Sequence, residues 1–196
     1  NALKLKIPEI LPRFESGDVP RVVTEGDVDD LLGLPDPLLG GFSDRARAFI
    51  QIQQGCDQGC TFCIIHRARG ASRSLPADGI LNRIRRLADS GCREFVLCGV
   101  DLGSWGLDLP VKARPGLPDL LTEILSIDGE FRIRLGSLDP VHITPRLIEL
   151  MASEPRVCPH LHVSLQSGHT MILKRMKRRY DRELLYRAVL SARDAM

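Results

Sequence analysis

The stretch IQQGCDQGCTFCIIHRARG, residues 52–70, places three cysteines, Cys56, Cys60 and Cys63, within eight positions. The residues AFIQIQQ at 48–54 lead into it, alternate between apolar and polar side chains, and are rich in strand formers. Such alternation predicts a β-strand. The cysteines are therefore expected on a loop that directly follows a strand.

A strand followed by a helix recurs along the rest of the chain. After Pro76, the residues Ile80, Ile84 and Leu87 fall on one face at helical spacing, and Gly91 follows as a stop signal. The further predicted elements are strands at 94–100, 131–137 and 160–165, and helices at 118–127, 145–152 and around 185–192. This alternation implies right-handed crossovers and a parallel sheet. The predicted fold is α/β with about four βα units, which suits either a partial or open barrel or a flat doubly wound sheet.

Unusual residues follow every predicted strand at its carboxyl end. The cysteines follow the first strand, and the segments after the other three are GVDLGSWG (99–106), GSLDP (136–140) and LQSGHT (165–170). Both candidate architectures bind ligands at these ends of the strands. The candidate ligand contacts on this rim are Gly99, Val100, Asp101, Ser137 and Gln166.

Composition limits the class of protein only broadly. The 196 residues are 43% hydrophobic and 27% charged, as in an ordinary soluble protein. A net charge of +2 permits a nucleic-acid partner without arguing for one. No apolar run reaches the length of a membrane span and the start does not resemble a signal peptide, so we expect a cytoplasmic protein without membrane contact. In that reducing compartment the six cysteines are expected to be metal ligands or core residues rather than disulfides.

The first part of the chain has a different texture. Residues 1–45 carry five prolines and no cysteine, and they show no sustained period of a strand or a helix. We expect a linker or extended N-terminal arm there, with one short helix near Asp27–Leu32. The core domain is then expected to span residues 46–196.

Three clustered cysteines raise the choice between zinc and an iron–sulfur cluster. Structural zinc usually takes four ligands in two separated pairs, whereas Cys56-x3-Cys60-x2-Cys63 has no second pair nearby. His66 offers a fourth ligand for a Cys3His zinc module that binds RNA, but such a loop would be cramped and would have no fold of its own to hold together. Three thiolates suit an iron–sulfur cube with one iron left open for a substrate or cofactor. A non-enzymatic iron–sulfur electron carrier is a further alternative.

Basic residues gather in two segments beside these strand ends. Arg178 lies in MKRRY, just past the fourth predicted strand, and its guanidinium suits a carboxylate or phosphate contact. The crowding of six basic residues between positions 174 and 182 equally suits a solvated helix face. Arg67, Arg69 and Arg73 follow the cysteine loop, where they would track an RNA backbone or simply favour solubility.

The remaining cysteines and histidines show no metal-ligand spacing. Cys98 lies inside a predicted strand and is expected to be a small buried hydrophobic residue. The residues without an assigned role are Cys92, Cys158, His142, His160, His162 and His169.

The cysteine motif, with Phe62 before its last cysteine, resembles the cluster motif of the radical S-adenosylmethionine (SAM) enzymes. Within that superfamily, residues 52–70 resemble the methylthiotransferases. The segments LCGVDLGSWG, RIRLGSLDP and LHVSLQSGHTMILKRMKRRYDRE match later segments of that family in the same order. The resemblance covers about residues 46–196. One departure occurs at His66 and Arg67, where the family usually has proline and an aromatic residue.

This resemblance implies a partial (β/α) barrel with parallel strands and a [4Fe–4S] cluster held by Cys56, Cys60 and Cys63. The open iron would bind the amino and carboxylate groups of SAM, and an electron from the cluster would yield a 5′-deoxyadenosyl radical. The backbone at Gly99, Val100 and Asp101 would approach the methionine end. The other implied cofactor contacts are Phe62, Ser137, Gln166 and Arg178.

The resemblance also implies a substrate. VDLGSWG, GSLDP and VSLQSG look most like the enzymes that insert a methylthio group at carbon 2 of N6-threonylcarbamoyladenosine beside the tRNA anticodon. The alternatives within the family are isopentenyladenosine in tRNA and an aspartate of a ribosomal protein. The implied partners are the anticodon loop of tRNA and a reductant protein such as flavodoxin or ferredoxin.

Family members carry two further parts that residues 46–196 do not match. One is a preceding domain with three cysteines for a second, sulfur-donating [4Fe–4S] cluster, and the other is a small RNA-binding β-barrel. We therefore expect this chain to be a piece of a longer enzyme with a truncated barrel. The second cluster is expected only in the missing N-terminal domain.

Overall fold

The architecture is taken from a computed structural model that describes residues 46–110 and 115–196, together with Pro12 and Ser16. The linker predicted at 1–45 and its short helix near Asp27–Leu32 otherwise lie outside the described residues.

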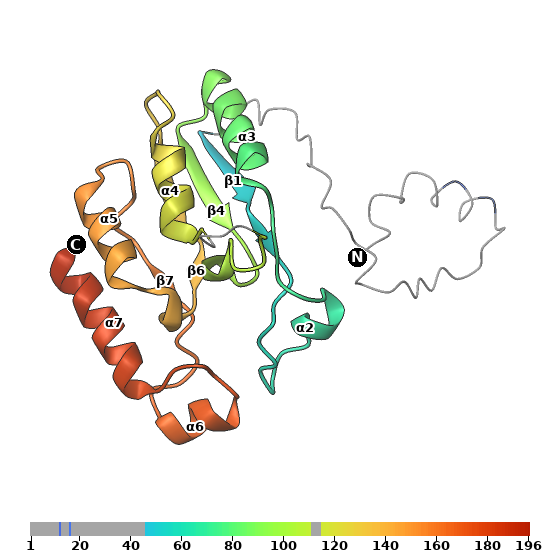
Figure 1. Cartoon of the computed structure of the whole chain (residues 1–196), viewed down its shortest axis with the longest axis vertical. Helices are drawn as coiled ribbons and strands as arrows, with labels where there is room; N and C mark the ends of the chain where they lie inside the picture. The colour runs from blue at the N-terminus through green and yellow to red at the C-terminus, as the bar shows by residue number, and fades with distance from the viewer. Residues whose placement is uncertain (1–11, 13–15, 17–45, 111–114) are drawn as a thin grey trace.

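Parallel strands form the centre of the described chain (Figure 1). Strands β1 (Arg47–Gln51), β4 (Glu94–Cys98) and β5 (Arg132–Leu135) form one sheet in the order β1-β4-β5, with both pairings parallel. Strands β6 (Ser137–Leu138) and β7 (His162–Val163) form a further parallel pair. The predicted parallel α/β fold is therefore confirmed, and within the described residues the strands do not close on themselves.

Four helices follow the strands and pack side by side along the chain (Figure 1). They are α3 (Ala77–Asp89), α4 (Leu117–Leu125), α5 (Pro145–Ser153) and α7 (Arg182–Ala195). Their apolar faces join the strands in one hydrophobic core. Strand β4 is covered on both faces, as parallel strands usually are, whereas β1 alternates buried and exposed residues.

Two shorter helices were not predicted. The helix α2 (Ile65–Ala68) lies in the cysteine loop, and α6 (Thr170–Arg175) precedes the last helix. Two 3-10 turns, η3 (Leu102–Ser104) and η4 (Pro140–His142), directly follow the strand ends that the sequence marked as the working rim. Among the described residues, none of the helices is long and apolar enough to cross a membrane.

The strand predicted at 48–54 is broken in the structure. The Ile52 amide donates to the Cys98 carbonyl at 2.9 Å, and the Ile52 carbonyl accepts from the Leu75 amide at 2.8 Å. The chain therefore leaves β4, and β2 (Gln53–Gln54) pairs antiparallel with β3 (Arg73–Ser74). The prediction of one continuous strand was wrong because period-two alternation does not tell which neighbour each residue pairs with.

The strand predicted at 131–137 is also divided, and Gly136 is the reason. A Cβ atom at this position would lie 2.8 Å from the carbonyl oxygen of Leu97, so only glycine allows the two backbones to come this close. The backbone changes direction there. Strand β5, before Gly136, pairs with β4, whereas β6, after it, pairs with β7.

One buried carboxylate ties the three strands of the main sheet together. Glu94 of β4 has a side chain only 5% exposed, and its oxygens lie 2.7 Å from Nε of Arg47 on β1 and 2.7 Å from Nε of Arg132 on β5. Arg134 adds a third contact at 3.0 Å. Burial would raise the pKa of Glu94, but hydrogen bonds from Arg134 and Arg132 and the nearby arginine charges lower it overall.

Replacing Glu94 by glutamine should lower the free energy of unfolding by about 1–2 kcal/mol, because three arginines lose their shared anion. The partly exposed arginines keep the loss modest, since water screens them. Glu123→Gln, at an exposed position on α4, is the matched control. Urea denaturation should separate the two variants, and an equal effect of both would contradict a role for Glu94 in joining the strands.

Candidate functional site

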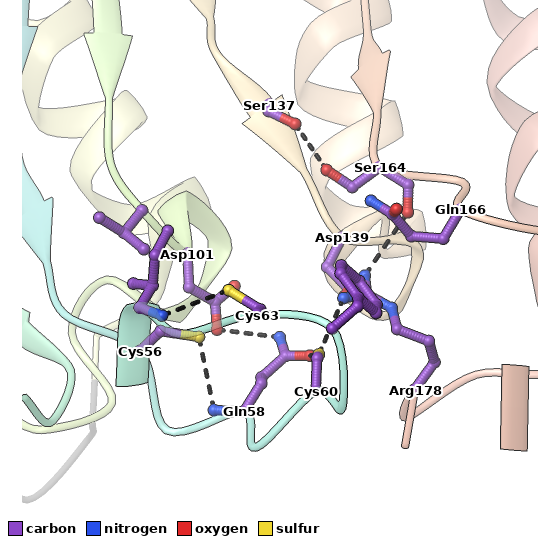
Figure 2. Close-up of a pocket in the computed structure, with 13 residues that line it drawn as sticks. Cys56, Gln58, Cys60, Cys63, Asp101, Ser137, Asp139, Ser164, Gln166 and Arg178 are labelled. Carbon is purple, nitrogen blue, oxygen red and sulfur yellow. Dashed lines mark hydrogen bonds and ion pairs between the residues drawn. The ribbon is translucent and has the colours of Figure 1, made fainter. Parts of the chain in front are cut away.

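A cavity of about 160 Å³ lies at the carboxyl ends of the strands (Figure 2). Nine of the ten residues predicted for the site line it. They are Cys56, Cys60, Cys63, Phe62, Val100, Asp101, Ser137, Gln166 and Arg178. Gly99 is the exception, because it packs against Gln53, whose Oε1 would lie 2.9 Å from a Cβ at Gly99. The predicted working rim is thus a single concave site.

The cysteine loop is shaped by backbone contacts at its two ends. Gly55 has φ +72°, and a Cβ there would lie 1.8 Å from the carbonyl oxygen of Ala71, so the position requires glycine. The Cys56 amide donates to the Gly70 carbonyl at 3.1 Å, and the Ser72 amide donates to the Asp57 carboxylate at 2.9 Å. These contacts hold the start and end of the loop against each other.

Each of the three sulfur atoms accepts a hydrogen bond from nitrogen (Figure 2). The Gln58 amide lies 3.4 Å from the sulfur of Cys56, and the Ile65 amide lies 3.5 Å from that of Cys63. The donor to Cys60 is a side chain from far along the chain, the guanidinium of Arg178, at 3.3 Å. Such donors stabilise negative charge on sulfur, as metal-bound thiolates require.

The donor set fits a metal cluster that is bound through sulfur. All six cysteines are free, and the three of the motif share one cavity. Burial raises the pKa of Cys56, so a bound metal has to displace its proton. His66, the fourth ligand of the zinc alternative, does not line the cavity. Within residues 46–110 and 115–196, no three cysteine, histidine or acidic side chains are already grouped closely enough to share one metal ion.

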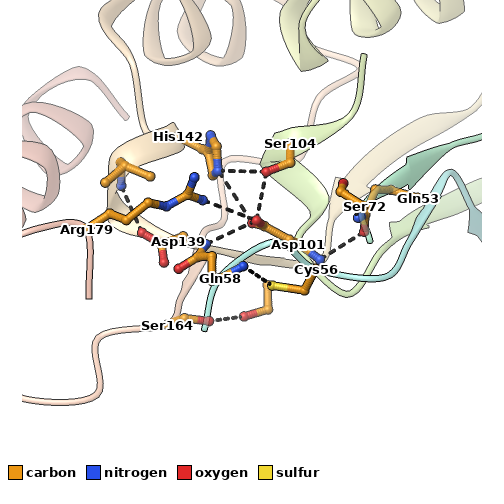
Figure 3. Close-up of polar contacts among 12 residues, drawn as sticks. Gln53, Cys56, Gln58, Ser72, Asp101, Ser104, Asp139, His142, Ser164 and Arg179 are labelled. Atoms are coloured by element: carbon orange, nitrogen blue, oxygen red, sulfur yellow. Dashed lines mark hydrogen bonds and ion pairs between the residues drawn. The ribbon is translucent and has the colours of Figure 1, made fainter. Parts of the chain in front are cut away.

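Asp101 joins the cysteine loop to three other segments (Figure 3). Its carboxylate, 4% exposed, accepts from Gln58 Nε2 at 3.1 Å and from the Ser104 hydroxyl at 2.7 Å. His142 Nε2 lies 3.4 Å from one carboxylate oxygen, and Arg179 Nη2 lies 3.2 Å from the other. Gln58 lies between Cys56 and Cys60 in the sequence, so its hydrogen bond to Asp101 fixes the cysteine loop beside the cavity. We call the Asp101 carboxylate with these four partners the hub.

The charge of Asp101 is strongly stabilised. Burial would raise its pKa, but hydrogen bonds from His142, Ser104 and Gln58 lower the pKa to about 2. Its backbone amide also donates to Gln53 Oε1 at 2.9 Å, and the Gln53 amide group donates to the Ser72 hydroxyl at 2.9 Å. A buried carboxylate with this many donors is held in one orientation.

Serines of two neighbouring strands meet on the far side of the cavity. The hydroxyl of Ser137, the first residue of β6, lies 2.6 Å from the hydroxyl of Ser164, which directly follows β7. Gln166 follows with φ 61°, a left-handed backbone conformation that is uncommon for a residue other than glycine. Phe62 is 53% exposed although it lines the cavity, so its ring lies at the opening.

Sequence reasoning missed several residues of the site. His142 received no role, yet it contacts Asp101 from η4. Gln58, Asp139 and Ser164 also line the cavity. These three residues stood in segments already singled out, Gln58 between the cysteines, Asp139 in GSLDP and Ser164 in VSLQSG. His142 carried no signal because its partner is distant in sequence.

The structure also places the basic residues after the cysteine loop and the three cysteines outside the motif. Arg73 folds back onto its own loop and donates to the Arg69 carbonyl at 2.8 Å, while Arg67 is exposed. Cys92 and Cys158 are buried. Cys98 is only half-buried at the end of β4, so the prediction of a buried residue was wrong there.

Comparison with known proteins identifies sequence relatives of this chain. The model of the radical SAM superfamily matches residues 50–196. A threonylcarbamoyladenosine tRNA methylthiotransferase, MtaB of Rickettsia prowazekii, is 43% identical over 159 residues, which cover 79% of this chain and 37% of the relative. A tRNA-2-methylthio-N(6)-dimethylallyladenosine synthase of Carboxydothermus hydrogenoformans is 38% identical over 179 residues, 91% of this chain and 39% of the relative.

Solved structures share the fold at low sequence identity. The cobalamin-dependent S-adenosylmethionine radical enzyme OxsB, with aqua-cobalamin and S-adenosylmethionine bound, has a TM-score of 0.59 and 15% identity, over 74% of this chain and 22% of that one. The radical S-adenosylmethionine methyltransferase TsrM from Kitasatospora setae, with cobalamin and a [4Fe–4S] cluster bound, has a TM-score of 0.58 and 19% identity, over 76% of this chain and 29% of that one.

This chain therefore belongs to the radical SAM superfamily and, within it, to the methylthiotransferase family. Membership implies a [4Fe–4S] cluster and S-adenosylmethionine as cofactors. The chain spans 37% and 39% of the length of the two relatives described above.

Proposed function

We propose that this chain is the radical-generating part of an enzyme that inserts a methylthio group at carbon 2 of N6-threonylcarbamoyladenosine, next to the tRNA anticodon. The observation that carries the proposal is the cavity at the strand ends, where three free thiols each accept an N–H donor. The relatives named for threonylcarbamoyladenosine, including the 43% identical protein, favour this base over the alternatives.

In this proposal Cys56, Cys60 and Cys63 hold the cluster and leave one iron open to SAM. A bound [4Fe–4S] cluster supplies the electron that cleaves a sulfur–carbon bond of SAM. The chain itself binds and orients the cofactor. Val100 and Phe62 offer apolar contact at the cavity wall, and the paired hydroxyls of Ser137 and Ser164 offer hydrogen bonds to a ribose or a carboxylate.

Three further residues of the predicted site have different roles in this proposal. Asp101 already accepts four donors, so its proposed role is to hold the cysteine loop rather than to bind the cofactor directly. Gly99 acts through its close packing with Gln53. Gln166 lines the cavity and remains a proposed contact for SAM.

The partners of the whole enzyme are part of the same proposal. They are tRNA, through its anticodon loop, and a reductant such as flavodoxin or ferredoxin, which would deliver the electron. A second cluster would donate the sulfur from a domain outside this chain. Isopentenyladenosine in tRNA is the second candidate substrate, because the 38% identical relative is named for dimethylallyladenosine. An aspartate of a ribosomal protein is the third.

Nucleoside mass spectrometry of tRNA from cells with and without the full-length gene tests the substrate. The proposal expects loss of the 2-methylthio form of threonylcarbamoyladenosine and accumulation of its unmodified precursor. Loss of methylthio-isopentenyladenosine alone would assign the second candidate. Unchanged tRNA would exclude both nucleosides as substrates and would leave the ribosomal-protein aspartate as the candidate.

A further inference from the structure

Arg178 is the basic residue whose surroundings differ most from a solvated surface. Its side chain is 8% exposed, whereas that of the neighbouring Arg179 is 45% exposed. Nη1 lies 3.3 Å from the sulfur of Cys60, and Nη2 forms an ion pair with Asp139, whose side chain is 4% exposed (Figure 2). Of the two readings that the sequence allowed, the solvated helix face is therefore excluded for this residue.

The guanidinium is fixed from several sides. It stacks on the Tyr180 ring, with 5.1 Å from the guanidinium carbon to the ring centroid. The Tyr180 hydroxyl donates to the carbonyls of Ser164 at 2.8 Å and Leu165 at 2.5 Å, just after β7. Asp139 is itself fixed, since its carboxylate accepts from the Val141 amide at 3.2 Å.

The segment that carries Arg178 also contacts the cysteine loop directly. The amide of Thr61, next to Cys60, donates to the Met176 carbonyl at 3.2 Å, and the Thr61 hydroxyl donates to the Arg175 carbonyl at 3.2 Å. The distance between Cys60 and Arg178 is thus set by three separate contacts. A fixed, positively charged donor at one sulfur sets Cys60 apart from Cys56 and Cys63, whose donors are neutral amides of their own loop.

We propose that Arg178 is a positioning residue that orients the Cys60 thiolate and raises the reduction potential of the cluster bound there. The inference rests on the proposed function, because it requires Cys60 to be a cluster ligand. Reduction adds one negative charge to the cluster, and a charged N–H donor at a ligand sulfur stabilises that charge. Asp139 holds the donor in place and, as a counter-charge, limits the effect.

An anaerobic potentiometric titration of the reconstituted chain, followed by electron paramagnetic resonance without SAM, tests the inference. In Arg178→Met the ratio of reduced to oxidised cluster at a fixed potential should fall about tenfold, which for a one-electron couple is a shift of about 59 mV to lower potential. Arg182→Met removes the same charge from an exposed position on α7 and should leave the potential unchanged.

Two further variants cover the risk that Arg178→Met unfolds because Asp139 is left unpaired. Asp139→Asn alone should shift the potential upward, because the counter-charge is lost while the donor stays. Combining Asp139→Asn with Arg178→Met should restore folding and keep the downward shift. These opposite signs are not expected from a purely structural role.

Three results would overturn the inference. One is a folded, fully iron-loaded Arg178→Met protein with an unchanged potential. Another is a change in SAM affinity alone, which would make Arg178 a cofactor contact only. The last is iron loss in both variants that lack Arg178, which would make its role structural. If the unsubstituted chain formed no cluster, the proposed function would fail instead, and the iron analysis of that protein separates the two failures.

Discussion

Replacing Cys60 by alanine should abolish both the visible absorption of the reconstituted cluster and the cleavage of SAM. Cys60 is buried at the centre of the motif, and its sulfur lines the same cavity as those of Cys56 and Cys63. A [4Fe–4S] cluster that loses one of three protein thiolates finds no further cysteine within residues 52–70 to replace it. Alanine at Cys56 or Cys63 should have the same effect.

The matched control is Cys98→Ala. Cys98 is a free, half-buried cysteine at the end of β4 that does not line the cavity, and its thiol donates to the Val96 carbonyl at 3.4 Å. This variant should keep its iron, its colour and its SAM cleavage. Iron loss from a normally folded Cys98→Ala protein would show that the ligand assignment is wrong.

Replacing Asp101 by asparagine should lower the free energy of unfolding by about 2–3 kcal/mol and reduce iron loading. The substitution keeps the shape of the side chain but removes the charge that Arg179 and His142 face. An asparagine amide accepts at only one of its two terminal atoms. Either His142, which faces one carboxylate oxygen, or Gln58 and Ser104, which both donate to the other, therefore lose their acceptor. The loop that holds the cysteines should become less ordered.

Urea denaturation and iron analysis after anaerobic reconstitution measure the two effects. Asp194→Asn is the control, because its exposed pair with Arg193 should contribute almost nothing. If Asp101→Asn retained full stability and full iron loading, the carboxylate would not be the hub that orders the loop.

The same carboxylate predicts a pH dependence. The pKa of Asp101 falls from its ordinary value of 3.8 to about 2 in the folded protein. Because the folded-state pKa is the lower one, its stabilisation is present above about pH 4 and is lost as the pH falls through about 2. The shift corresponds to about 2 kcal/mol. Acid unfolding of the Asp101→Asn protein should therefore be less steep over this range than that of the unsubstituted protein.

Sequence reasoning reached the order of the elements and the working rim because both follow from local patterns. Alternation predicted the strand at β1, and the short apolar run EFVLCGV predicted β4 as a buried strand. The Thr144–Pro145 pair marks the start of α5, where the Thr144 hydroxyl accepts from the Leu147 amide at 3.3 Å. Since parallel strands end on one edge, residues from four predicted strand ends were expected together, and they meet in one cavity.

The details that were missed depend on contacts between distant residues. The break at Ile52 follows from its two different partners, because its amide still bonds to Cys98 of β4 while its carbonyl accepts from Leu75. The division at Gly136 accompanies the close approach of Leu97. His142 gains its role only because η4 brings it to Asp101. Arg178 could be distinguished from the other five basic residues between positions 174 and 182 only once its burial beside Cys60 was known. No local period or spacing contains this information.

We propose that Cys56, Cys60 and Cys63 hold an iron–sulfur cluster that acts on SAM. Anaerobic metal and sulfide analysis of the reconstituted protein, recorded with its visible spectrum, tests it most directly. We expect roughly four irons and four sulfides per chain for this cluster, with a brown colour that bleaches on reduction. One equivalent of zinc and a colourless protein would contradict it and would favour the Cys3His zinc module with His66.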